Sequence, residues 1–136
     1  MGSPREVVLA WVEAFNYRDA TAAAALYHED AVNMQVAAGE PTVGRQAIQD
    51  GFASFFRSFP DNYTRPVNLF EDGEWAILEW EGGGTLQGEF AGHQPSGRSY
   101  RLQGCGFFRV VGGKIAFQRG YWDKVSWFRQ LGLTAE

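Results

Sequence analysis

The spacing of apolar positions in the first sixty residues is typical of helices. A stripe at intervals of three and four follows the capping box Ser3-Pro4-Arg5-Glu6 and predicts a first helix that ends near Asn16. Asp19 is expected to cap a shorter helix that reaches about Leu26. A second stripe, from Ile48 to Phe59, predicts a third helix. Between these last two helices, the alternation over residues 31–36 predicts a strand.

From Tyr63 onward the apolar period changes to two, which is typical of strands. Strands are predicted over residues 63–71, 75–81, 84–91, 99–111 and 115–123, with turns at Asp72-Gly73, Gly82-Gly83 and Gly112-Gly113. A short helix from Val125 to Leu131 should follow them. Helices followed by hairpins predict an α+β fold, with helices on one face of an antiparallel sheet.

Composition agrees with a single domain over residues 1–136 that has an apolar interior. The chain is 45% hydrophobic and contains eleven Phe and five Trp, enough both to fill a core and to line a pocket. Its net charge is −4 and its basic residues are scattered, so no nucleic-acid partner is expected. No apolar run suits a membrane span or a secretory signal, which predicts no membrane partner and a cytoplasmic location. Cys105 has no second thiol for a disulfide or a metal cluster, and no metal is predicted.

Glycines suggest where a pocket forms. Gly104 and Gly106 lie two apart on one face of a predicted strand, where they would let the sheet bend and leave space. Counting back from a two-residue turn at Gly112-Gly113 pairs Val111 with Lys114, Gly106 with Arg119, Gly104 with Tyr121 and Leu102 with Asp123. The same count across Gly82-Gly83 places Trp80, Gln87 and Glu89 on one face. A slip of one residue would reverse every one of these assignments.

In that register Asp123 is the leading candidate for chemistry. A carboxylate among bulky side chains on the inner face could move protons near neutral pH. The alternative is that Asp123 caps the last helix, because Asp is a favoured N-cap residue. Glu89 could equally lie at a solvated rim. Tyr27 and Asn33, near the first strand, are candidate hydrogen-bonding groups for a ligand.

Several segments together carry a family resemblance. They are Phe15–Asp19, Leu26–His28, Glu40–Arg45, Thr85–Phe90, Gln94–Arg98, Gly113–Ile115, Tyr121–Asp123 and Arg129–Leu133. Over nearly the whole chain the sequence resembles the SnoaL-like polyketide cyclases and, beyond them, the limonene-epoxide hydrolases and ketosteroid isomerases. The resemblance implies a cone-shaped α+β fold in which a curved antiparallel sheet and N-terminal helices enclose a pocket. It makes homodimerisation through the sheet an expectation.

For chemistry the resemblance implies that Asp123 is the acid–base group of a cofactor-free reaction. Two further catalytic positions of the epoxide hydrolases fall on Gln87 and Glu89, so the arginine of that family is missing here. SnoaL-like cyclases often have a histidine where Gln87 stands. Without the arginine, Glu89 and Asp123 would repel each other if they were close, and one would hold a proton.

The residues and the resemblance together imply three candidate functions. The first is a cofactor-free cyclase or isomerase that acts on an apolar carbonyl or polyketide-like molecule through Asp123, Glu89 and Gln87. Its ligand-binding residues would be Tyr27, Asn33, Trp80, Arg119, Tyr121 and Trp122. The second is a non-catalytic domain that binds a small apolar ligand or dimerises. The third is epoxide hydrolysis, ranked last because the arginine is absent.

Overall fold

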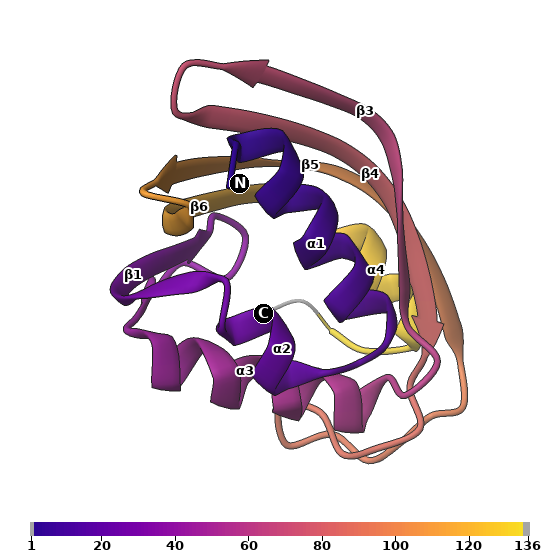
Figure 1. Cartoon of the computed structure of the whole chain (residues 1–136). Helices are drawn as coiled ribbons and strands as arrows, with labels where there is room; N and C mark the ends of the chain where they lie inside the picture. The colour runs from indigo at the N-terminus through magenta and orange to yellow at the C-terminus, as the bar shows by residue number, and fades with distance from the viewer. Residues whose placement is uncertain (1, 135–136) are drawn as a thin grey trace.

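The computed structural model describes residues 2–134, which form four helices and one sheet (Figure 1). The elements are α1 (Pro4–Asn16), α2 (Ala20–Ala24), β1 (Tyr27–Gln35), β2 (Thr42–Val43), α3 (Arg45–Ser58), β3 (Tyr63–Asp72), β4 (Trp75–Thr85), β5 (Ser99–Val111), β6 (Lys114–Trp122) and α4 (Lys124–Leu131). None of the helices in residues 2–134 has the length and apolarity needed to cross a membrane.

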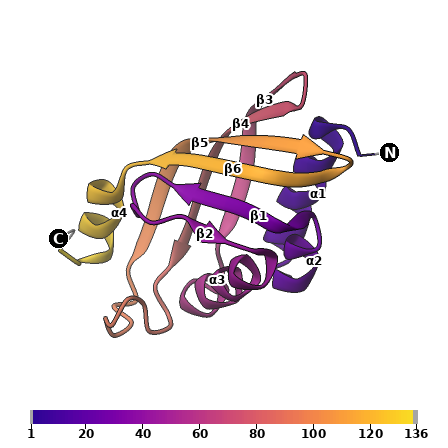
Figure 2. The same cartoon turned by 90° about the vertical axis from the view of Figure 1, so that its left-hand side faces the viewer.

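The six strands form one curved sheet in the order β2-β1-β6-β5-β4-β3. All neighbours are antiparallel except β1 and β6, which run parallel. Figures 1 and 2 show α1, α2 and α3 on the concave side of the sheet, with α4 at one end. The α+β class predicted from the sequence is confirmed. The parallel pair follows from the long connection through β2, α3 and the remaining strands, because adjacent parallel strands require a crossover.

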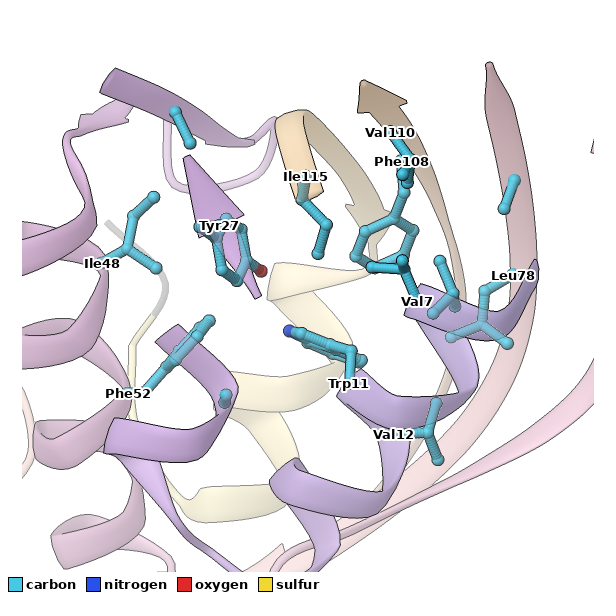
Figure 3. Packing of buried hydrophobic residues seen from close by; sticks show 14 of the residues in the cluster. Val7, Trp11, Val12, Tyr27, Ile48, Phe52, Leu78, Phe108, Val110 and Ile115 are labelled. Carbon is cyan, nitrogen blue, oxygen red and sulfur yellow. The ribbon is translucent and has the colours of Figure 1, made fainter. Parts of the chain in front are cut away.

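Helix α1 begins where the capping box predicts. The Ser3 hydroxyl accepts from the Glu6 backbone N–H at 3.2 Å, and a Glu6 carboxylate oxygen accepts from the Ser3 N–H at 3.1 Å. The helix then buries its apolar stripe against the sheet and α3. Figure 3 shows this core, in which side chains of α1 meet Tyr27, Phe52 and Phe108. A second apolar cluster lies at the α4 end, around Phe59, Tyr100 and Trp127.

The hairpin predicted at Gly82-Gly83 does not exist, and the strand predicted over residues 84–91 is wrong. Strand β4 continues through these glycines to Thr85 and pairs with β5 along its whole length. An added Cβ at Gly82 would lie 2.5 Å from the Tyr63 carbonyl oxygen, and one at Gly83 would lie 2.5 Å from that of Tyr100. The glycines therefore permit close backbone approach within the sheet and do not form a turn.

The register predicted for the last hairpin is correct for two pairs and then fails. Val111 faces Lys114 and Val110 faces Ile115, but a bulge next to Ala116 makes Arg109 face Phe117. From there the register is shifted by one residue, so Gly106 faces Gly120 and Gly104 faces Trp122. This slip reverses the predicted faces of β6.

One aromatic ring occupies the glycine strip of the concave face. Trp80 faces Gly104 in register, and its indole lies over the position that a Gly104 side chain would fill. A Cβ at Gly104 would lie 2.6 Å from Trp80 Cζ2 and 2.7 Å from the Tyr121 carbonyl oxygen. The sheet therefore needs glycine at this position in order to hold Trp80 flat against it.

We expect Gly104→Ala to destabilise the fold by about 1–3 kcal/mol, the usual cost of overpacking. Gly106→Ala, on the same face of the same strand, is the matched control, because the nearest atoms to its Cβ would be the Phe108 ring edge at 3.3 Å and the Arg119 carbonyl oxygen at 3.9 Å. Urea denaturation of both variants measures the difference. Equal stabilities would contradict this account of Trp80.

Candidate functional site

A cavity of about 290 Å³ lies between the concave face of the sheet and the helices. Its walls are mostly aromatic and come from almost every element of the fold. The lining residues with apolar side chains include Trp11, Phe15, Phe52, Phe55, Leu78, Trp80, Leu102, Phe108, Trp122 and Trp127. On its floor Gly106 and Gly120 face each other in register, so the centre of the sheet contributes space and no side chain.

Among the described residues, no Asp, Glu, Lys, Arg or His side chain lines this cavity. Its polar groups are amides, hydroxyls and indole N–H groups. Burial raises the pKa of Tyr100, and the charge of Asp61 adds to the rise. Tyr100 therefore stays protonated and is a hydrogen-bonding group, not a base, near neutral pH.

Two amides and an indole form a chain of hydrogen bonds along the edge of the floor. The Trp122 indole N–H donates to Gln35 Oε1 at 2.8 Å, and Gln35 Nε2 donates to Asn33 Oδ1 at 2.7 Å. Gly120 makes this possible, because any Cβ there would collide with the Gln35 side chain. The Asn33 NH₂ group, at the end of the chain, has no protein partner among residues 2–134.

A second chain of hydrogen bonds starts in the core. The hydroxyl of Tyr27, which is fully buried, donates to Gln118 Oε1. Burial raises the pKa of Tyr27, and the Trp11 indole N–H, which faces the hydroxyl, only partly opposes the rise (Figure 3). Gln118 is 5% exposed and lines the cavity, where its NH₂ group has no protein partner within the described chain.

Three other polar atoms of lining residues have no hydrogen-bond partner in the described part of the chain. They are Trp11 Nε1, Trp127 Nε1 and Asn62 Oδ1. The Asn62 amide is oriented by its Nδ2, which donates to the Phe59 carbonyl at 2.8 Å. Buried polar atoms are normally paired, so these three are exceptions, and none of them has accessible surface through which a ligand in the cavity could reach it.

The cavity position predicted for Asp123 is wrong, and the alternative is observed. Asp123 is exposed and caps α4, with its carboxylate accepting from the Ser126 N–H at 3.0 Å. It borders a polar depression with Glu81, Arg101 and Gln103, outside the aromatic cavity. Its role as the acid–base group stays a prediction, and the structure gives it no place in the lining.

Gln87 and Glu89 are also outside the cavity. Both are exposed and lie in the loop after β4, where the Gln87 N–H donates to the Ser58 carbonyl and the Glu89 carbonyl accepts from the Ser58 hydroxyl. A turn at Gly82-Gly83 would put both side chains beside Trp80, but β4 continues through these glycines. Their catalytic roles are untested.

The predicted ligand-binding residues divide between the two faces of the sheet. Asn33, Trp80 and Trp122 line the cavity, and Tyr27 lies behind it in contact with Gln118. The bulge turns Arg119 and Tyr121 to the convex face, where the Arg119 guanidinium lies over the Phe107 and Phe117 rings. Tyr121 is 42% exposed.

Sequence reasoning missed Gln35, Gln118 and Gly51 as lining residues. Gln35 carried a signal, because it alternates with Asn33 along the same strand. Gln118 alternates with Gly120 and Trp122, but the bulge hid the face that they share. Gly51 is an exposed glycine inside α3 at which an added Cβ would meet nothing within 4 Å, a combination that only the structure reveals.

The chain matches the family model for the SnoaL-like polyketide cyclases over residues 5–131 and belongs to that family. No curated protein sequence matches it. Many solved structures share the fold.

One of these structures is a proposed polyketide cyclase from Xanthomonas campestris, with a TM-score of 0.86 and 25% identity over 95% of this chain and 96% of that one. IdmH of Streptomyces antibioticus, another proposed polyketide cyclase, has a TM-score of 0.79 and 25% identity over 96% of this chain and 99% of that one. A protein of Catenulispora acidiphila with a ketosteroid isomerase-like fold, solved in complex with trimethylamine, has a TM-score of 0.83 and 22% identity over 96% of this chain and 95% of that one.

The position of Asp123 predicts a structural effect of its removal. We expect Asp123→Ala to lower the free energy of unfolding by about 1 kcal/mol, because the N-cap bond to Ser126 is lost. Asp123→Asn should retain most of the stability, since Asn caps equally well. Urea denaturation measures both variants. Unchanged stability in Asp123→Ala would show that the cap does not stabilise α4.

Proposed function

We propose that this protein binds an uncharged, largely apolar small molecule in the cavity. The observation that carries the proposal is the lining itself, which is aromatic and, within residues 2–134, free of Asp, Glu, Lys, Arg and His side chains. A charged ligand would lose its hydration without gaining a counter-ion, a cost of several kcal/mol. An apolar ligand gains roughly 25 cal/mol for each Å² that it buries.

Cavity size sets a limit on the ligand. A volume of about 290 Å³ lies at the lower end of the range for small-molecule pockets. Flat ring systems suit it best, because four lining tryptophans offer broad faces for stacking. Of the functions predicted from the sequence, the binding domain therefore has the strongest structural support.

Cofactor-free cyclase or isomerase activity is the second candidate. Membership of the cyclase family and the likeness to two proposed polyketide cyclases favour it. Amide donors in the cavity could stabilise a developing enolate by fixed dipoles. A carboxylate base in the lining, which the acid–base mechanism needs, is absent from the described residues. Epoxide hydrolysis has no support from the lining.

Gly51 provides the test of ligand binding. It is exposed yet lines the cavity, which places it at the entrance. We expect Gly51→Trp to weaken binding of a neutral polycyclic hydrocarbon such as fluorene by at least about tenfold, a loss that displacing one ring contact can produce. Quenching of tryptophan fluorescence measures the affinity.

Two controls accompany this variant. Gly51→Ala should bind fluorene normally and be more stable by about 0.5–1 kcal/mol, because alanine favours a helix interior. Ala47→Trp, at an exposed position of α3 outside the lining, should also leave binding unchanged. Full affinity in Gly51→Trp would argue against this entrance, and no binding by the unmodified protein would contradict the proposed function.

We also propose that the protein is a homodimer, as the family resemblance implies. The convex face of the sheet presents Tyr121, which is 42% exposed and packs against the Phe107 ring, and Phe70, which is 58% exposed and lies in register with Phe107 across Ile77 of β4. Exposed apolar clusters of this kind are typical of protein interfaces. The cytoplasmic location predicted from the sequence remains part of the proposal.

We expect sedimentation velocity to find a dimer of the unmodified protein and a monomer of Tyr121→Lys, because burying the added ammonium group in an apolar interface is unfavourable. Val125→Lys, at a position of α4 that is 53% exposed, is the control and should remain dimeric. A monomeric unmodified protein would show that the dimer prediction is wrong.

A further inference from the structure

Two amide side chains stand side by side on the cavity floor. Asn33 on β1 and Gln118 on β6 are register partners in the parallel pair, and both line the cavity. Adjacent strands lie about 4.8 Å apart, so a single ligand atom above the two strands can contact both side chains. What such a pair binds depends on which end of each amide faces the cavity.

The orientation of Asn33 follows from donor and acceptor chemistry. An indole N–H can only donate, so Trp122 requires the oxygen of Gln35 on its side. The NH₂ group of Gln35 must then point to Asn33, and it donates to Asn33 Oδ1. The remaining group of Asn33 is its NH₂, and the cavity is therefore offered a donor.

Gln118 is oriented in the same way. Burial raises the pKa of the Tyr27 hydroxyl, so it keeps its hydrogen and donates it to Gln118. Gln118 accepts it through Oε1 and keeps its NH₂ group free. One chain begins at the Trp122 indole N–H and the other at the Tyr27 hydroxyl, and each ends at an NH₂ group of a residue that lines the cavity.

We propose that Asn33 and Gln118 form a paired donor site for one carbonyl oxygen of the ligand. Trp122, acting through Gln35, is the positioning residue that makes Asn33 present its NH₂ group to the cavity. The inference rests on the proposed function. A carbonyl oxygen carries two lone pairs and no hydrogen, and so it can accept from both amides at once. A hydroxyl oxygen would bring a hydrogen that finds no acceptor in the pair.

Fluorenone and fluorene test the pair, because they share three fused rings and differ by the carbonyl oxygen. We expect the unmodified protein to bind fluorenone about tenfold more tightly than fluorene, the effect of hydrogen bonds to a neutral acceptor. Tryptophan fluorescence quenching gives both affinities. The infrared C=O stretch of bound fluorenone should lie at a lower wavenumber than in hexane, which reports the hydrogen bonds directly.

Trp122→Phe tests the positioning role. This variant keeps an aromatic wall but lets the Gln35 amide reverse, so the preference for fluorenone should fall to about threefold or less as one donor is lost. The ratio of the two affinities cancels any loss of wall contact. Trp127→Phe is the matched control, because Trp127 also lines the cavity but its N–H belongs to neither chain. It should preserve the tenfold ratio.

The outcomes separate the two proposals. If fluorene and fluorenone bind equally well and the C=O stretch is unshifted, the paired donor site is wrong and the proposed function stands. If neither compound binds, the proposed function fails and the paired site with it. A ratio that survives in Trp122→Phe would overturn the positioning role of Trp122.

Discussion

The constraint on which this structure depends is the absence of side chains at the centre of a curved sheet. Gly82, Gly104, Gly106 and Gly120 occupy the concave face where a regular sheet would present bulky residues. They let one indole lie flat on the strands and let Gln35 cross β6 to reach Trp122. The helices pack around this floor without filling it, because their apolar stripes meet the larger side chains at its margin. The cavity is therefore a consequence of the sheet sequence more than of the helices.

The polarity of the site has a separate origin. An amide is ambiguous by itself, since it offers a donor and an acceptor of nearly equal size. Here Asn33 and Gln118 are each reached by a donor, the Trp122 indole acting through Gln35 on one side and the deeply buried Tyr27 hydroxyl on the other. Burial raises the pKa of that tyrosine, which keeps its hydrogen in place across the physiological range. The amide groups of this neutral site are therefore oriented without the help of a charged residue.

Much of the fold could be predicted from the sequence because the interactions that form these elements join residues only a few positions apart. The capping box set the start of α1, and the apolar stripes identified the buried faces of α1 and α3. Failures came where the physical cause lay outside the segment. Gly82 and Gly83 have the composition of a turn, yet the Tyr63 and Tyr100 carbonyl oxygens on neighbouring strands explain them. The bulge beside Ala116 has no signal in the alternation of β6, and it alone moved Arg119 and Tyr121 to the convex face and Gln118 to the cavity.

Asp123 shows why family membership and chemistry have to be argued separately. The family resemblance aligns Asp123 with an acid–base group. Where its side chain lies depends on the register of β6, which the bulge shifts by one residue, and on where α4 begins. A carboxylate that satisfies the first turn of a helix is held by a backbone N–H and by solvent, and both favour a role in stability. The cavity, meanwhile, lies within the same cyclase-family fold while its lining offers donors in place of a base. In the proposed function such a site accepts a ligand oxygen, and fixed dipoles of this kind are also the groups that stabilise negative charge on an oxygen in acid–base enzymes.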